Sequence, residues 1–454
     1  MKPSFLQPAA IFAFALLAVS AQAGDWPQWR GPFFNGSTDE KGLPSKWSKT
    51  ENVAWVADLP GPAASTPVVW GNHVFLSGVD ATNNSLQVMC FDRASGKRMW
   101  SHDVAKGISR DHRSNYANAS PVTDGTLTIF LFGNGDLVCF DLIGVRRWSR
   151  NIERDFGPFA FYWTFGGSPL LFDGRLYLQI LQRDVPVQGR GRSDRENESF
   201  LLALDPQTGK TLWRHVRPSQ AVAESRESHT TPIPMVYKGQ PQLVIAGGDA
   251  LSGHDAATGK EIWRWGSWNP QRNRSWPLIA SSVAADGVAL VCVPKGQPVY
   301  AIRVDQTGTL DERGVAWNTH DARTVTSEVP TPAYYDGDFF VLSDSRKTLS
   351  RLDPRTGAVK WNIRTPGKAK YEASPLAADG KIYLINFDGQ VAVIRAQDGQ
   401  LINEIPMDEP AEGGMVRSSI VASHGQLFIR TTRRLYCVGT DAADATGLRG
   451  RNTK

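Results

Sequence analysis

Short apolar runs, each bounded by polar turns, recur along almost the whole chain. Leu127–Phe132 (LTIFLF) is a typical run, because it is apolar at every position except Thr128 and is followed by Gly133. Runs of this length, rich in β-branched and aromatic residues, predict strands, and apolar residues on both faces predict sheets that are covered on both sides. Glycines after the first run of a repeat, such as Gly125 and Gly174, predict tight hairpins with positive φ. The pattern therefore predicts an all-β protein of short antiparallel strands.

One repeating unit accounts for these runs. Each copy opens with Ser or Thr, usually before Pro, and continues through apolar strands and a turn of the Asp-x-x-Thr-Gly-Lys type to a Trp. The eight copies open at Thr66, Ser120, Ser168, Thr231, Ser281, Thr331, Ser374 and Ser418–Ser419. The closing tryptophans are Trp55, Trp100, Trp148, Trp213, Trp263, Trp317 and Trp361, and the seventh copy has Glu404 instead. A period of about 40–50 residues is typical of β-propellers with four-stranded blades.

The two ends of the repeat array complement each other. The last copy stops at Gly439 before a fourth strand, whereas Val53–Trp55 has the pattern of a fourth strand that no copy precedes. We expect this N-terminal strand to complete the last blade, because a closed ring leaves no blade incomplete. The sequence thus predicts an eight-bladed β-propeller of four-stranded antiparallel blades over residues 52–440. The seven tryptophans are interpreted as core residues between blades, not as cofactor ligands.

The repeats resemble the PQQ-type repeat with its tryptophan-docking motif, since seven Trp and six Ser/Thr-Pro pairs agree in phase. The opening segment Asp25–Pro32 (DWPQWRGP) resembles the start of exported PQQ-like propellers of environmental bacteria. The resemblance implies two different functions. In quinoprotein dehydrogenases the ring holds PQQ and Ca²⁺ near its axis, with a catalytic Asp and a disulfide of adjacent cysteines. In BamB-like proteins the ring is a scaffold that binds other chains.

The cysteines depart from the enzyme pattern. No two of the four are adjacent, no CxxC or CxxCH is present, and no Asp matches the catalytic one by motif. Cys90, Cys139 and Cys437 occupy the same place in three copies, and equivalent strands of neighbouring blades lie beyond disulfide reach. We expect them to be small buried core residues. The chain is also shorter than the enzymes, and a Cys for lipid anchoring, which membrane-anchored BamB proteins carry, is missing near Ala23.

The N-terminal residues predict export. Lys2, the short apolar run Ala9–Val19 and the motif Ala21-Gln22-Ala23 form the pattern of a signal peptide that is cleaved after Ala23. Residues 24–51 are then a lead-in segment and residues 441–454 a disordered tail. No later run has the roughly 18 apolar residues of a membrane helix. We expect a periplasmic or secreted protein that does not span a membrane and is a monomer, because a closed ring needs no second subunit.

Charge narrows the range of partners. The chain has 50 Lys and Arg against 45 Asp and Glu, and they are scattered, so no nucleic-acid-binding stripe is expected. Two Arg-rich stretches, Arg183–Arg195 and Arg264–Arg274, are interpreted as solvated loops. The insertion Gln182–Glu198 has almost no apolar residue, so we expect a mobile loop there, with partner binding as the alternative.

Candidate functional residues lie in the loops that precede the innermost strands, because these loops converge around the axis of a propeller. The loops are rich in aromatic, Arg and carboxylate side chains, which suit a polar pocket. The ligand-binding candidates are Arg113, Tyr116, Asn118, Trp163, Glu227, His229, Arg274, Trp276, Glu328, Tyr371, Glu372 and Arg417.

Three interpretations of these residues stay open: hydrogen bonding between loops, a funnel that binds a ligand or peptide, and catalysis. For catalysis, Glu227, Glu328 and Glu372 would supply oxygen ligands to Ca²⁺, and His229 or His112 would act as a general base. No complete catalytic motif is present, and no catalytic residue is assigned.

We therefore expect a ligand- or protein-binding scaffold without chemistry of its own, whose partner is a small molecule, a carbohydrate or a protein. The alternative is a PQQ- or metal-dependent oxidoreductase acting on alcohols or sugars, with PQQ and Ca²⁺ as its cofactors.

Overall fold

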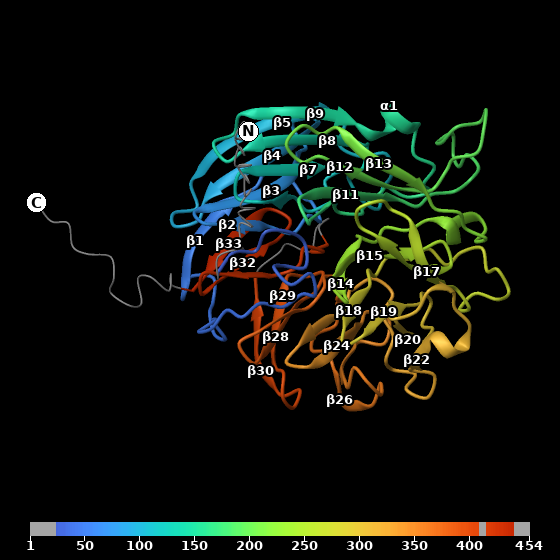
Figure 1. Cartoon of the computed structure of the whole chain (residues 1–454). Helices are drawn as coiled ribbons and strands as arrows, with labels where there is room; N and C mark the ends of the chain where they lie inside the picture. The colour runs from blue at the N-terminus through green and yellow to red at the C-terminus, as the bar shows by residue number, and fades with distance from the viewer. Residues whose placement is uncertain (1–23, 408–414, 440–454) are drawn as a thin grey trace, which may run out of the picture.

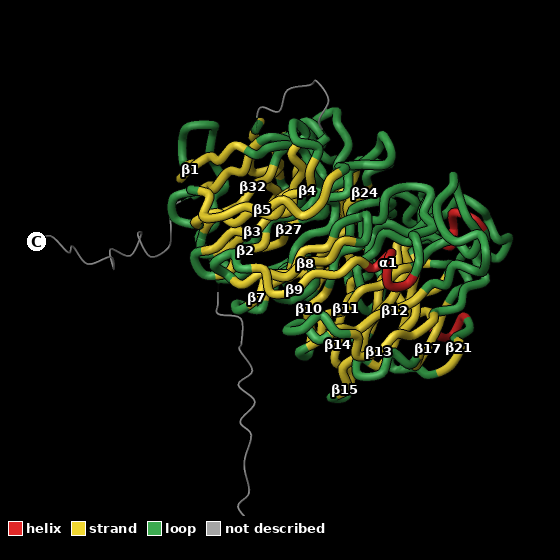
Figure 2. The backbone as a smooth tube through the Cα atoms, turned by 90° about the horizontal axis from the view of Figure 1, so that it is seen from above, coloured by secondary structure: helices red, strands yellow, loops and turns green. Residues whose placement is uncertain are grey.

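The computed structural model describes residues 24–407 and 415–439, and their strands form eight sheets, antiparallel apart from one short added strand, arranged in chain order around one axis (Figure 1). The expected signal peptide and tail lie outside the described residues. First strands of neighbouring blades contact each other, which places them at the axis. Helix is confined to α1 (Ile152–Phe156) and the short turns η1 (Ala223–Arg226) and η2 (Glu312–Gly314) in the described part of the chain (Figure 2).

The strands of the first four blades run outwards from the axis in sequence order. Blade one contains β2 (Val68–Trp70), β3 (His73–Asp80), β4 (Ser85–Asp92) and β5 (Arg98–Lys106). Blade two contains β6 (Val122–Thr123), β7 (Leu127–Leu131), β8 (Asp136–Asp141) and β9 (Arg146–Asn151). Blade three contains β10 (Leu170–Phe172), β11 (Arg175–Ile180), β12 (Phe200–Leu204) and β13 (Thr211–Val216). Blade four contains β14 (Ile233–Tyr237), β15 (Gln240–Gly247), β16 (Ala250–Asp255) and β17 (Glu261–Trp265).

The other four blades repeat this order with two variations. Blade five contains β18 (Val283–Ala285), β19 (Val288–Cys292), β20 (Val299–Arg303) and β22 (Val315–Asn318), and its extra strand β21 (Gly308–Thr309) pairs in parallel with β17. Blade six contains β23 (Ala333–Tyr335), β24 (Asp338–Ser343), β25 (Thr348–Leu352) and β26 (Val359–Arg364). Blade seven contains β27 (Leu376–Ala378), β28 (Lys381–Ile385), β29 (Gln390–Arg395) and β30 (Leu401–Pro406). Blade eight contains β31 (Val421–Ser423), β32 (Gln426–Arg430), β33 (Arg434–Val438) and β1 (Val53–Asp58).

Blade eight confirms the predicted closure of the ring. Strand β1 pairs antiparallel with β33, with Val53 opposite Val438 and Trp55 opposite Cys437. The outermost strand of the last blade therefore comes from the start of the repeat array. The predicted eight-bladed all-β architecture is confirmed.

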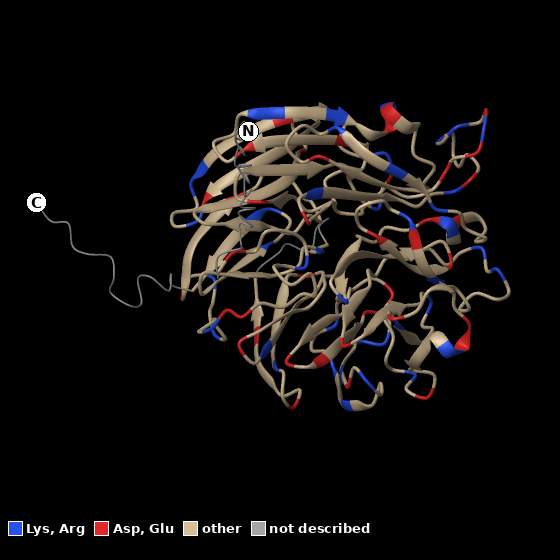
Figure 3. Ribbon diagram, viewed as in Figure 1, with Lys and Arg blue, Asp and Glu red and all other residues tan. Residues whose placement is uncertain are grey.

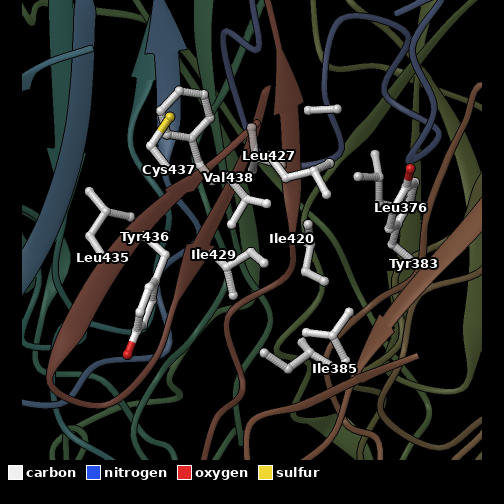
Figure 4. Packing of buried hydrophobic residues seen from close by; sticks show 14 of the residues in the cluster. Leu376, Tyr383, Ile385, Ile420, Leu427, Ile429, Leu435, Tyr436, Cys437 and Val438 are labelled. Carbon is white, nitrogen blue, oxygen red and sulfur yellow. The ribbon is translucent and has the colours of Figure 1, made fainter. Parts of the chain in front are cut away.

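The core lies between the blades. All five residues of β7 are buried, as a sheet covered on both faces requires. Figure 4 shows the same arrangement between the last two blades, where Tyr383 and Ile385 of β28 lie in one apolar cluster with Leu427 and Ile429 of β32. All four cysteines are free and buried, as the sequence predicts for three of them.

Tryptophan docking joins successive blades. The indole N–H of Trp100 donates to the carbonyl of Leu142 in the next blade at 2.9 Å. The ring lies on Gly144, where an added Cβ would come within 2.7 Å of it. The same ring-on-glycine contact joins Trp55 to Gly96, Trp148 to Gly209, Trp213 to Gly259, Trp317 to Gly357 and Trp361 to Gly399. Six of the seven predicted tryptophans therefore pack as interpreted.

Trp263 is the exception, because it stays within its own blade. Its ring lies against Gly253 of β16, and Gly308, which stands where blade five would present its docking glycine, is paired beside Trp263 in β21. The segment of blade five that contains β21 therefore covers the outer edge of blade four. It does not provide the glycine on which Trp263 would otherwise pack.

The lead-in segment runs through the centre of the ring, beside the innermost strands. Trp26 forms a bridge with Val69 of blade one and Gln28 with Val122 of blade two. Further along, the Arg30 guanidinium donates to the carbonyls of Pro332 and Pro375, in blades six and seven. Because the segment contacts blades on opposite sides of the axis, it blocks the central channel beside these strands.

Candidate functional site

A closed circle of hydrogen bonds joins all eight blades where the innermost strands begin. The backbone N–H of Thr66 donates to the hydroxyl oxygen of Ser120 at 2.9 Å, and that of Ser120 donates to Ser168 at 3.0 Å. The same bond repeats through Thr231, Ser281, Thr331, Ser374 and Ser419, and Ser419 closes the circle on Thr66 at 3.2 Å. We call these eight residues the hydroxyl ring. A short hydroxyl side chain supplies the acceptor in every blade, which is why each repeat opens with Ser or Thr.

A pocket of about 280 Å³, here called the axial pocket, lies at the hydroxyl ring. Every ring residue except Ser281 lines it, together with Trp29 of the lead-in. Six of the twelve predicted site residues also line it, namely Arg113, Asn118, Trp163, His229, Glu372 and Arg417. Because the lead-in blocks the channel beside the innermost strands, the pocket is blind on that side and opens towards the loops that precede these strands, here called the axial loops.

Charged and aromatic side chains are paired around the mouth of the axial pocket. The Arg113 guanidinium carbon lies 4.8 Å from the centroid of the Trp163 ring. Arg417 donates to Glu372 at 3.1 Å and to the Arg113 carbonyl at 2.9 Å. Burial raises the pKa of Glu372, although the nearby Arg417 opposes this shift. The pocket therefore has two guanidinium groups and one carboxylate near its opening.

His229 brings a neutral imidazole to the axial pocket. Desolvation lowers its pKa to about 4, so the ring is uncharged at neutral pH. Its ring lies 5.6 Å from that of Phe161, and among the described residues the imidazole has no hydrogen-bond partner. One ring nitrogen can therefore donate to a ligand and the other can accept from it.

Three other predicted residues are held in the protein interior. Glu227 is fully buried, pairs with Arg183 and accepts from the Tyr162 N–H at 3.0 Å. The Tyr371 hydroxyl donates to the Pro366 carbonyl at 2.9 Å. Tyr116 packs against the apolar cluster between blades one and two. These side chains position loops and core, and none of them lines the axial pocket.

The last three predicted residues lie away from the axial pocket as well. Trp276 packs against the core of blades four and five, and Arg274 is exposed. Glu328 forms an ion pair with Lys295 at 2.9 Å. The expected calcium ligands Glu227, Glu328 and Glu372 therefore do not converge, because the first two are each paired with a cation elsewhere. In residues 24–407 and 415–439, no three His, Cys, Asp or Glu side chains are grouped so that they could hold a metal ion.

The blade-three insertion is fastened to the axial loops. Besides the Arg183–Glu227 pair, Arg190 donates to the carbonyls of Tyr162 at 2.6 Å and Arg110 at 3.1 Å. On this side of the insertion, for which the sequence predicts a mobile loop, polar contacts join the loop to its neighbours without an apolar core. Through Tyr162 these contacts hold the turn that carries Trp163.

Trp29 and the hydroxyl ring are among the pocket residues that the sequence candidates did not include. Trp29 belongs to a segment whose path across the ring the repeat pattern does not predict. The hydroxyl ring was visible as the opening Ser or Thr of each repeat, but its role in the pocket depends on the ring geometry. A second depression of about 350 Å³, which shares Arg113, Asn118 and Arg417, adjoins the axial pocket and extends to His112 and Met415.

The fold and the axial pocket define the class, an eight-bladed propeller with four-stranded blades and a blind axial pocket. A sequence model of the family described as outer membrane protein assembly factor BamB matches residues 37–160 and 196–439, most of the chain. The protein therefore belongs to this family of PQQ-like repeat propellers.

Curated relatives include quinone-dependent enzymes. Quinohemoprotein alcohol dehydrogenase ADH IIB of Pseudomonas putida is 26% identical over 211 residues, which are 44% of this chain and 27% of that protein. The dehydrogenase subunit of alcohol dehydrogenase (quinone) of Komagataeibacter europaeus is 28% identical over 170 residues, 36% of this chain and 21% of that protein. The matches span only about a quarter of these relatives.

Solved structures with the same fold include a quinohemoprotein alcohol dehydrogenase and a BamB protein. Quinohemoprotein alcohol dehydrogenase from Comamonas testosteroni has a TM-score of 0.62 at 13% identity, covering 93% of this chain and 82% of its own. BamB from Moraxella catarrhalis has a TM-score of 0.55 at 13% identity, covering 86% and 97%. At these identities the likeness shows the fold alone. Within the described residues, no helix is long and apolar enough to cross a membrane.

Proposed function

We propose that this chain is an exported propeller that binds a ligand or partner in its axial pocket and performs no chemistry of its own. The observation that carries the proposal is the blind axial pocket, where six of the predicted binding residues meet. Its polar groups suit recognition, because Asn118 and His229 have no hydrogen-bond partner among the described side chains. Aromatic faces at Trp29 and Trp163 with a few polar groups between them are typical of binding pockets.

The contacts of the ionisable groups favour binding over catalysis. Glu372, the carboxylate at the pocket, is held by Arg417. All four cysteines are buried within blades, and burial raises the pKa of Cys139 and Cys292 to about 12, which keeps these thiols protonated and unreactive. The match to the family described as outer membrane protein assembly factor BamB supports a binding role.

A quinone-dependent alcohol dehydrogenase is the alternative, and the two curated relatives favour it. The residues of the axial pocket fit such a cofactor only in part. Arg113 and Arg417 match the carboxylates of PQQ, but no oxygen-ligand set for Ca²⁺ is present among the described residues. The donor set therefore does not fit the PQQ–calcium pair.

One purified preparation tests both functions. The protein is incubated with PQQ and Ca²⁺, and dye reduction is followed with a panel of alcohols and sugars. We expect no turnover above a heat-inactivated control. In parallel, thermal-shift screening of small solutes should give hits that Trp163→Ala weakens and Arg154→Gln, on exposed α1, does not. Turnover with PQQ and Ca²⁺ would overturn the proposal.

A further inference from the structure

The hydroxyl ring has a hydrogen-bonding capacity that the protein itself does not use. Each ring oxygen accepts an N–H from the preceding blade, and none of the eight hydroxyls donates to a protein atom in the described part of the chain. All eight residues are at least nine-tenths buried, and seven of them line the axial pocket. The pocket is therefore lined with O–H donors that lack acceptors.

Other groups add to this excess of donors. The indole N–H groups of Trp29 and Trp163 and the amide of Asn118 also have no acceptor among the described residues, and each of these residues lines the pocket. The acceptors that the protein leaves without any hydrogen bond are few, namely the Asn118 carbonyl oxygen and one nitrogen of His229, since Arg417 already engages Glu372. Each ring oxygen keeps a second lone pair, but it is already satisfied by one N–H. Because donors without acceptors are costly when buried, the pocket is complementary to a ligand that mainly accepts hydrogen bonds.

The charged side chains at the axial pocket indicate which kind of hydrogen-bond-accepting ligand it prefers. Arg113 stacks on Trp163 and forms no ion pair with any described residue, while Arg417 and Glu372 offset each other. The charged side chains that line the axial pocket, Arg113, Arg417 and Glu372, therefore sum to one positive charge, and the neutral His229 does not change this sum. The Asp111 carboxylate lies outside the axial pocket, where it accepts from Thr164, and it lines the adjoining depression. Hydroxyl and guanidinium donors directed at one volume favour an oxyanion over a neutral polar solute.

We infer that the axial pocket takes the carboxylate or phosphate group of a small anionic solute. The oxyanion accepts hydrogen bonds from the hydroxyl ring inside the axial pocket, and Arg113 pairs with it at the pocket mouth. The remainder of the solute extends into the adjoining depression at His112 and Met415. This inference rests on the proposed binding function and names the class of ligand for the same site.

Isothermal titration calorimetry with matched solutes tests the inference. D-glucuronate and D-glucose differ in one carboxylate, and inorganic phosphate and sulfate distinguish a tetrahedral oxyanion from a carboxylate, all at equal ionic strength. We expect at least one of the three anions to bind and glucose not to bind. Binding of phosphate or sulfate alone supports the inference and assigns the site to a tetrahedral oxyanion.

Variants link binding to the pocket. Arg113→Gln should weaken anion binding about tenfold or more, since it removes a charge-assisted hydrogen bond from an exposed side chain that the fold does not need. Asn118→Asp places a carboxylate in the pocket and should abolish binding. Arg154→Gln removes a charge that is also exposed, on α1 and outside the axial pocket, and should leave binding unchanged.

Two results would overturn the inference while leaving the proposed function intact. Glucose binding as tightly as glucuronate would show a site for neutral sugars. Anion binding that Arg113→Gln and Asn118→Asp do not alter would place the anion elsewhere. Turnover with PQQ and Ca²⁺, in contrast, would overturn the proposed function itself.

Discussion

At the scale of single residues, the docking glycines show how one position joins two blades. Gly144 has a φ of +89° and supports the Trp100 ring, where an added Cβ would come within 2.7 Å. The left-handed backbone and the close ring contact both exclude a side chain. The repeat pattern predicts the tryptophan and the turn, but the reason for this glycine lies in the neighbouring blade.

Gly144→Ala should therefore destabilise the protein more than an alanine at a glycine with free space around it. Gly174 is the matched control, because its φ of +69° is also positive but nothing lies within 4 Å of an added Cβ. We expect a loss of about 1 kcal/mol for Gly174→Ala and about 2–4 kcal/mol for Gly144→Ala, which adds overpacking to strain. Urea denaturation measures both. Equal losses would show that the tryptophan adapts freely.

The buried carboxyl group of Glu227 should make the stability of the protein depend on pH. Desolvation raises its pKa to about 7, whereas in the unfolded chain it titrates near 4.5, so the folded state binds more protons between these values. This group should therefore lower the free energy of unfolding as pH rises from about 4.5 to about 7, with no further change above. His229 should have the opposite effect, because burial depresses its pKa to about 4 in the folded state, so its contribution to the free energy of unfolding rises with pH.

Glu227→Gln should remove the pH dependence caused by Glu227 and keep the one caused by His229. In the variant, stability should then rise more steeply with pH between about 4.5 and 6.5 than in the wild type. Urea midpoints at several pH values measure the two slopes. Parallel pH profiles for variant and wild type would contradict the role assigned to Glu227.

At the scale of elements, sequence patterns predict the strands well and the connections poorly. The apolar runs and Ser/Thr openings locate four strands in each blade, because strand periodicity and turn residues are local properties. The lead-in and the blade-three insertion carry no such period. Trp29 and Arg190 act through contacts with residues far along the chain, so their contributions to the pocket depend on tertiary structure.

Strand β1 is the element whose loss is most informative. Deletion of residues 24–59 removes β1 from β33 and Trp55 from its contact on Gly96, so blade eight loses its outer strand and its link to blade one. We expect the truncated protein to be cleaved rapidly by protease in blade eight or to fail to fold. Deletion of residues 440–454 serves as the control and should leave protease resistance unchanged. A truncated ring as resistant as the full chain would argue against closure by β1.

At the scale of the whole molecule, the predicted ring is confirmed, and six of the twelve predicted site residues line the axial pocket. The axial loops do converge, but the ends of their side chains do not all reach the axis: Glu227 and Tyr371 turn into the interior, and Arg274 stays on the surface. Loop sequence indicates which residues are near the axis, and only the packing of neighbouring loops decides which ones face it. The charges are likewise interspersed over the blades, without a single-sign stripe in the described chain (Figure 3).

At this scale, the hydroxyl ring should contribute to the stability of the whole propeller. Ser281 holds its place in the ring without lining the axial pocket, so its substitution tests the ring alone. Ser281→Ala leaves the buried N–H of Thr231 without its acceptor and should cost about 1–3 kcal/mol. Ser281→Thr keeps the hydroxyl, as Thr66, Thr231 and Thr331 do, and should cost less. Because the circle joins all blades, the loss in Ser281→Ala should appear as one cooperative transition at lower urea concentration. Equal stability of the two variants would show that packing of the first strands, and not the hydrogen-bonded circle, holds the blades at the axis.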